Sequence, residues 1–215
     1  MAIVHDIVLA STSVYRQKIL KDAAVPFRVA VSAVDEDQIS DKSPAVVARL
    51  RAEAKARAVA ANEQRSLIIG ADQVLGLDGQ SYGKAASEDE ARQRLLMFAG
   101  KTHILHTAYA LACQDEGGGM WMFSRVIDVA MRMRTLSKAE IDAYIASGEW
   151  QGVAGCYQLE HRGVHLMRAP IGEATAIIGL PLPELLQDLR VMGINFLVQA
   201  SGPWQVSLST LGKDR

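Results

Sequence analysis

Cysteine is scarce in this chain of 215 residues, which contains only Cys113 and Cys156. Two cysteines do not make the disulfide framework of a small secreted protein, so we expect free thiols and a cytoplasmic location. The opening MAIVHDIVLAS lacks the basic segment of a secretory signal. No uninterrupted apolar run reaches the roughly 20 residues that span a bilayer, so we expect no membrane association.

An excess of positive charge is also missing, since 23 Lys and Arg face 24 Asp and Glu. Without a global basic field, a nucleic acid polymer is not an expected partner, and a phosphate ligand must meet a local cluster of cations. The sequence lacks a GxxxxGK[ST] loop, a GxSxG elbow and zinc-type spacing of cysteine and histidine. His103 and His106 fall in a predicted strand, where a separation of three places them on opposite faces.

The 49% of hydrophobic residues suffices for a substantial core. Periodicity and turn signals predict an α/β fold: an elongated, twisted mixed sheet flanked by helices, with two lobes and a deep cleft. We expect one domain over residues 1–194 and a loosely held extension over 195–215. Strands are predicted at 3–10, 27–34, 66–72, 102–114, 121–134, 152–159 and 163–171, and a strand and hairpin turning at Asp78-Gly79 at 74–83. Helices are predicted at 11–24, 45–63, 87–100, 137–148 and 181–193.

Hydroxyl groups and an arginine follow the first predicted strand: Ser11, Thr12, Ser13 and Arg16. Hydroxyls and backbone N–H groups at a helix N-terminus bind phosphate, and an arginine one turn later can fork onto the same group. The alternative is ordinary N-capping with a solvated arginine.

Asp72 follows the apolar run LIIGA, which we expect to be a buried strand ending there. A carboxylate in such a place costs free energy unless it is paired or metal-bound, so Asp72 is a candidate metal ligand or general base. The alternative is an aspartate that caps a turn. Lys84 follows Gly83 and could reach a phosphate as a point charge, or lie exposed in its loop.

An acidic cluster, Asp35, Glu36 and Asp37, follows the second predicted strand. Mg²⁺ prefers oxygen ligands and retains several waters, so one of these acids with Asp72 would make a sparse magnesium site. A solvated acidic loop is the alternative.

Five segments in the same order and spacing resemble the Maf proteins, also called septum formation inhibitors. The family's motifs LASxSPRRxxLL, GADTVV…GKP, SGxTHxVyTgvAL, sGEp…KAGaYgIQG and VvGLPL resemble LASTSVYRQKIL, IIGADQVLGLDGQSYGKA, AGKTHILHTAYAL, SGEWQGVAGCYQLEHRG and IIGLPLPELLQDL. The resemblance covers roughly residues 5–190.

The resemblance implies an inosine triphosphatase-like α/β fold and a nucleoside triphosphate pyrophosphatase, which cleaves its substrate between the α and β phosphates. It also implies a divalent cation, Mg²⁺ or Mn²⁺, and a possible homodimer. Carried over by position, Asp72 is the catalytic acid and a metal ligand, and Glu36 is a further acid beside the metal. The implied substrate-binding residues are Ser11, Ser13, Arg16, Lys55, Gln73, Lys84 and Glu160.

Departures from the family pattern bear on the substrate. Tyr15 stands where one arginine is usual, Val153 replaces a lysine and Glu160 replaces a glutamine. Together with Gln73, these residues resemble the branch that acts on 7-methyl-GTP, and the Glu160 carboxylate could accept hydrogen bonds from a guanine edge. A second hypothesis is a nucleotide-binding regulator of division without turnover, which the missing arginine would suit.

Overall fold

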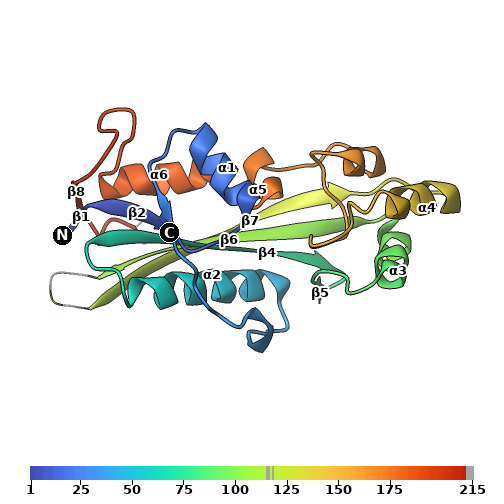
Figure 1. Cartoon of the computed structure of the whole chain (residues 1–215), viewed down its shortest axis with the longest axis horizontal. Coiled ribbons are helices and arrows are strands. Elements are labelled where there is room, and N and C mark those ends of the chain that lie inside the picture. The colour runs from blue at the N-terminus through green and yellow to red at the C-terminus, as the bar shows by residue number, and fades with distance from the viewer. Residues whose placement is uncertain (115–116, 118, 212–215) are drawn as a thin grey trace.

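The computed structural model describes residues 1–114, 117 and 119–211. Long strands run along the axis of an elongated molecule, with helices on both sides (Figure 1). The strands are β1 (Ala2–Val4), β2 (Asp6–Leu9), β3 (Arg28–Val29), β4 (Ser66–Leu77), β5 (Gln80–Tyr82), β6 (Thr102–Gln114), β7 (Met120–Arg132) and β8 (Trp204–Val206). The helices are α1 (Val14–Asp22), α2 (Pro44–Ala60), α3 (Glu88–Phe98), α4 (Lys138–Ala146), α5 (Ala174–Ile178) and α6 (Leu182–Met192), with 3-10 turns at Glu36–Gln38 and Arg162–Leu166.

The main sheet has six strands in the order β3-β2-β4-β6-β7, and β5 pairs with β4. β2 runs parallel to β3 and β4, whereas β4, β6 and β7 pair antiparallel. The expected mixed α/β sheet is therefore confirmed. None of the helices within the described residues is long and apolar enough to cross a bilayer.

Alternation along β4 decides which side chains meet which helix. Leu67 and Ile69 join the core cluster that contains residues of α1 and α6, whereas Ile68 joins the cluster built on α2. Because successive strand residues point to opposite faces, Asp72 lies on the α2 side and Gln73 on the α5 side. Figure 1 shows α2 on one face of the sheet and α1, α5 and α6 on the other.

A glycine allows α2 to approach the sheet closely. A Cβ atom on Gly70 would lie 2.2 Å from the Ala52 carbonyl oxygen and 2.7 Å from the Ala56 nitrogen. Only glycine avoids contact with the helix backbone at this distance. Lys55, which lies between these two alanines on α2, meets Asp72 at the distance that this close approach allows.

Three strand predictions are wrong in extent. The strand predicted to end at Asp72 continues to Leu77, because β6 pairs with it from Ile68 through Gly76. The strand predicted over 27–34 is only two residues long, since its neighbour β2 ends at Leu9 and leaves later residues without a partner. The strand predicted over 3–10 divides at His5 into β1 and β2, which belong to different sheets.

Two other expectations are also wrong. Residues 152–171 form turns and a 3-10 segment with isolated bridges, because Gly152, Gly155 and Cys156 adopt positive φ values that bend the chain away from a strand. The tail is held by β8, which pairs antiparallel with β1. Trp204 and Val206 are 3% and 0% exposed, so these two side chains of β8 belong to the core.

Candidate active site

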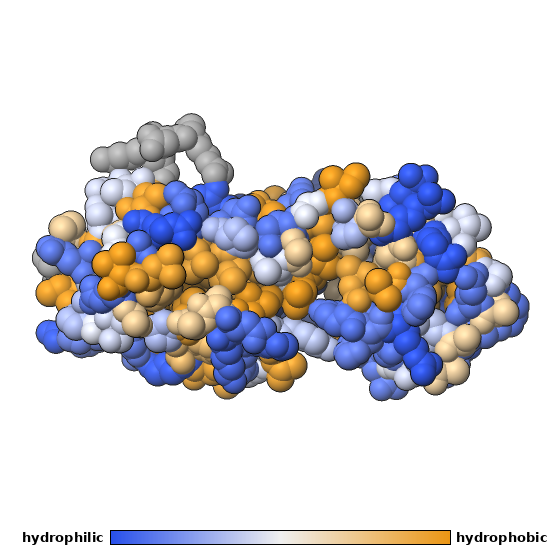
Figure 2. Space-filling view, turned by 90° about the horizontal axis from the view of Figure 1, so that it is seen from above, coloured by the Kyte–Doolittle hydropathy of each residue, from blue (hydrophilic) through white to orange (hydrophobic). Residues whose placement is uncertain are grey.

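A cavity of about 1230 Å³ opens along the middle of the sheet and collects side chains from segments far apart in the sequence. Figure 2 shows the surface hollowed and narrowed near the middle of the long axis. All nine predicted site residues line this cavity: Ser11, Ser13, Arg16, Glu36, Lys55, Asp72, Gln73, Lys84 and Glu160. Tertiary folding therefore brings the whole predicted set together.

Arg16 is fixed at the start of α1 by its own neighbours. Ser13 caps the helix and accepts a hydrogen bond from the Arg16 backbone nitrogen. The Arg16 guanidinium donates from Nη1 to Ser11 Oγ at 3.0 Å and from Nε to the Gly179 carbonyl at 2.9 Å. Burial lowers the pKa of Arg16, and the charges of Asp72 and Glu36 oppose that shift. N-capping and placement of Arg16 in the cavity thus occur together.

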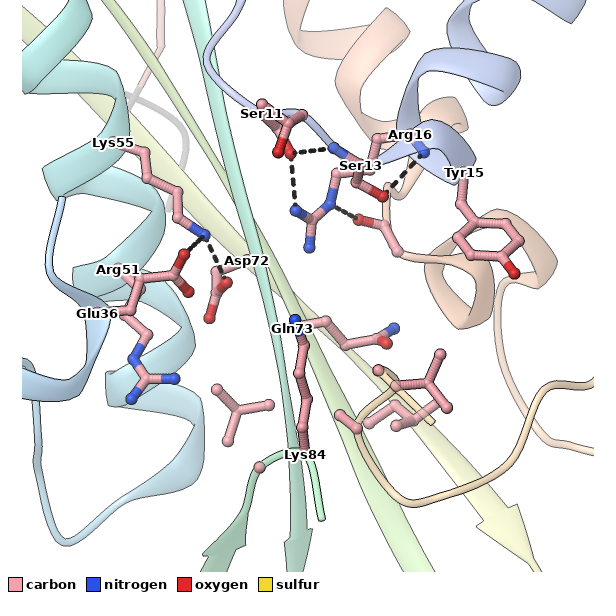
Figure 3. Close-up of a pocket in the computed structure, with 18 of the residues that line it drawn as sticks. Ser11, Ser13, Tyr15, Arg16, Glu36, Arg51, Lys55, Asp72, Gln73 and Lys84 are labelled. Carbon is pink, nitrogen blue, oxygen red and sulfur yellow. Dashed lines mark hydrogen bonds and ion pairs between the residues drawn. The ribbon is translucent and has the colours of Figure 1, made fainter. Parts of the chain in front are cut away.

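Lys55 joins the two predicted metal-side acids. Its ammonium lies 2.8 Å from Asp72 Oδ1 and 2.9 Å from Glu36 Oε1 (Figure 3). Lys55 and Asp72 are 6% and 5% exposed, and the other carboxylate oxygen of Asp72, Oδ2, is buried without a hydrogen-bond partner. A buried carboxylate oxygen left unpaired is costly, so this atom is a ready acceptor for a cation or a proton donor.

The two carboxyl groups are shifted in opposite directions. Burial raises the pKa of Asp72 above its ordinary value, although Lys55 and Arg16 act against the shift. Burial also acts to raise the pKa of Glu36, but its hydrogen bond and ion pair with Lys55 outweigh burial and lower it. A cation placed beside Asp72 would favour its charged form.

The remaining predicted residues differ in whether other residues of the fold already bind their side chains. Gln73 Nε2 donates to Thr107 Oγ1 at 2.9 Å and to the Ala176 carbonyl at 2.8 Å, which ties α5 to the sheet. Lys84 is exposed and points into the cavity (Figure 3), and among the described residues its ammonium has no ion-pair or hydrogen-bond partner. Glu160 is exposed at the cavity wall.

Two lining residues were missed by the sequence-based site prediction. Gln158 accepts a hydrogen bond from the Tyr15 hydroxyl at 2.8 Å and thereby holds that ring at the wall. Arg51 lies on α2 one turn before Lys55 and lines the same cavity. The i, i+4 spacing of Arg51 and Lys55 places both on one helix face, a signal present in the sequence.

The histidine and cysteine side chains considered as metal ligands make contacts within the fold. His103 is buried and within 2.7 Å of the Tyr157 hydroxyl, whereas His106 contacts Asp128 at 2.7 Å on the opposite face of β6, as predicted. Cys156 is buried, and burial raises the pKa of its thiol. Within the part of the chain that the structure describes, no three His, Cys, Asp or Glu side chains group as a metal site.

Comparison with known proteins agrees with this fold. The family model described as Maf-like protein matches residues 6–192. The chain belongs to the Maf family. The match ends before β8, so the strand that pairs with β1 lies outside the part of this Maf chain that the family model covers.

Several curated relatives cover most of this Maf chain. It is 39% identical over 194 residues to a 7-methyl-GTP pyrophosphatase of Bartonella quintana, covering 87% of the chain and 96% of the relative. It is 41% identical over 199 residues to a nucleoside triphosphate pyrophosphatase of Caulobacter vibrioides, covering 87% and 96%. A 7-methyl-GTP pyrophosphatase of Cupriavidus pinatubonensis is 38% identical over 193 residues, covering 88% and 94%.

Proposed function

We propose that this chain is a nucleoside triphosphate pyrophosphatase that hydrolyses the α–β phosphoanhydride bond and releases a nucleoside monophosphate and pyrophosphate. The observation that carries the proposal is the convergence of Arg16 and Lys84 on a cavity that also holds the buried, half-paired carboxylate of Asp72. The names of the relatives from Bartonella and Caulobacter support the same reaction class.

In this mechanism Arg16 and Lys84 bind the phosphate oxygens. Ser11 and Gly179 fix the Arg16 guanidinium before substrate arrives, so little ordering is needed on binding. Asp72 Oδ2 accepts a proton from the attacking water, whose oxygen bonds to the α-phosphorus as the bond to the β-phosphate oxygen breaks. Pyrophosphate leaves with the electron pair of that bond.

The residues present fit a divalent cation. As the alternative to its role as the base, Asp72 offers its unpartnered oxygen to the cation, and Glu36 shares the Lys55 ammonium with Asp72. Mg²⁺ is commonly held by one or two carboxylates plus substrate phosphates and waters. Asp72 and Glu36 would hold Mg²⁺ or Mn²⁺, which when bound neutralises charge developing on the phosphate oxygens.

The finer proposal is that the base is 7-methylguanine. Tyr15 presents a ring whose hydroxyl is held by Gln158, and Glu160, two residues after Gln158, lines the same cavity. An aromatic face attracts a positively charged ring, and a carboxylate accepts hydrogen bonds from a guanine edge. Gln73 keeps its amide oxygen as an acceptor while its nitrogen binds α5.

A nucleotide panel with Mg²⁺ or Mn²⁺, scored for pyrophosphate and orthophosphate separately, tests the proposal. We expect pyrophosphate release, fastest with 7-methyl-GTP among methylated and unmethylated guanosine, uridine and thymidine triphosphates. Binding of nucleotides without any product would favour the regulator, and orthophosphate alone would indicate a phosphomonoesterase. Loss of turnover with EDTA would test the cation, and light scattering would test the proposed homodimer.

A further inference from the structure

Four cationic side chains line the cavity, but the fold already engages two of them. Lys55 is bound by Asp72 and Glu36, and Arg16 by Ser11 and Gly179. The Lys84 ammonium has no partner among the described residues. Arg51 makes one long hydrogen bond, from Nη2 to the Ile39 carbonyl at 3.4 Å.

The guanidinium of Arg51 retains unused donors. Its Nε is buried and has no hydrogen-bond partner. A guanidinium presents a planar fork of donors that matches phosphate oxygens, and an unpaired buried donor favours a ligand that supplies an acceptor. The charge of Arg51 also acts on Glu36, but Arg51 is the cavity arginine with the most hydrogen-bond donors left for an anion.

The cavity walls differ in chemistry, and Arg51 lies on the charged side. Tyr15 and Arg51 stand on opposite sides of the pocket, with Asp72 and Gln73 between them (Figure 3). Tyr157 and Leu159 flank Gln158, the hydrogen-bond partner of Tyr15, and also line the cavity, so this side suits a base. A nucleotide with its base at that wall and its α-phosphate at Asp72 extends its remaining phosphates toward Arg51.

We propose that Arg51 binds the departing pyrophosphate, so that the nucleotide lies across the cleft with its base at Tyr15 and its terminal phosphates at α2. This inference rests on the proposed function and adds the orientation of the substrate and a residue for the leaving group. Neutralising charge on the leaving oxygens favours breakage of the α–β bond.

Calorimetric titration with Mg²⁺-pyrophosphate and, separately, with GMP tests the assignment. We expect Arg51→Met to weaken pyrophosphate binding by about 10- to 100-fold, the usual effect of losing hydrogen bonds to a charged group, and to change GMP binding less than about twofold. Arg51→Lys, which keeps the charge without the fork, should fall between Arg51→Met and the unsubstituted protein. Arg57→Met is the matched control, because it removes the same charge from an exposed position of α2 outside the cavity lining.

Unchanged pyrophosphate binding in folded Arg51→Met, verified by circular dichroism, would overturn the assignment, as would equal losses for pyrophosphate and GMP. The proposed function fails separately, if the unsubstituted protein releases no pyrophosphate from any nucleotide. Since binding is measured with pyrophosphate and a nucleoside monophosphate and needs no turnover, the two failures are distinguishable.

Discussion

Asp72 and Asp188 are both buried aspartates that pair with a basic side chain across a helix–sheet contact. Asp188, on α6, accepts from Arg125 Nε at 2.9 Å and also binds Arg125 Nη2 and the Tyr109 hydroxyl, so both of its oxygens are occupied. Asp72 has one oxygen on Lys55 and the other unpaired. Asp188 lies outside the cavity lining, whereas Asp72 lies within it.

Whether both carboxylate oxygens are paired separates an ion pair that only stabilises the fold from one that can bind a ligand. A satisfied cluster such as Arg125–Asp188–Tyr109 holds α6 against β6 and β7 and leaves nothing for a ligand to bind. An incompletely satisfied cluster beside a cavity is less stable by itself and is completed by what binds there. A substitution at Asp72 should therefore mainly lower turnover, whereas a substitution at Asp188 should mainly lower stability.

The largest expected effect is on turnover at Asp72. We expect Asp72→Asn to reduce pyrophosphate release by about 10²- to 10⁴-fold, because the amide neither accepts the water's proton nor carries charge for a cation. Lys55 retains Glu36 as a partner, so the fold should persist. Steady-state kinetics and a thermal melt measure both; substantial activity in the folded variant would contradict the role of Asp72.

Asp188→Asn should show the reverse pattern. Removing one partner of a buried ion pair leaves Arg125 uncompensated, so we expect the free energy of unfolding to fall by about 3–5 kcal/mol. Urea denaturation measures this loss. Below the melting transition, pyrophosphate release per folded molecule should remain within about twofold; a selective loss of turnover would remove the distinction between the clusters.

His103 extends the comparison to a buried group that stays neutral. Burial lowers its pKa from 6.5 to about 4, so the unfolded chain binds a proton more readily than the folded one. The contribution of neutral His103 to the free energy of unfolding is therefore fully present above pH 6.5. It falls by about 3 kcal/mol as the pH is lowered toward 4. Denaturation at several pH values should show that the free energy of unfolding falls less steeply between pH 6.5 and 4 in His103→Gln than in the unsubstituted protein. We call this fall the acid slope.

The exposed His165 provides the control for that experiment. His165→Gln should leave the acid slope of the unsubstituted protein in place. An unchanged slope in His103→Gln would show that other groups carry the acid sensitivity.

Gly70→Ala tests how closely α2 must approach Asp72. Because the added Cβ would meet the Ala52 carbonyl at 2.2 Å, we expect a loss of about 1–3 kcal/mol in stability. Displacement of Lys55 and Arg51 on the same helix should also lower turnover. Gly83→Ala, which meets nothing within 4 Å, should leave the melting temperature unchanged; equal effects of both variants would contradict this explanation.

Local chemistry made many elements predictable. Ser13 caps α1, and Ser137 caps α4 through a complete capping box with Glu140, three residues later. Asp78 and Gly79 both have positive φ and form the predicted turn between β4 and β5. The sequence also predicts a turn at EGGG, residues 116–119, between the strands that became β6 and β7. Residues 116 and 118 of this turn lie outside the described residues.

Nonlocal pairing explains most of the errors. Nothing within SLIIGAD tells whether a strand stops at Asp72, because its continuation depends on β6, more than 30 residues later. The tail gave no periodic pattern, yet β1 supplies a strand edge for Trp204–Val206. The domain boundary at residue 194 stays a prediction, although β8 joins the two predicted parts.

The sequence by itself determined the helix starts other than that of α5, and the set of residues that could meet a polyphosphate. These follow from neighbours along the chain and from motif order. Only the tertiary structure decided that Lys55 lies between two carboxylates and that Arg51 faces the same cavity. Those contacts depend on how closely α2 packs on β4, and packing distance is a property of the folded core.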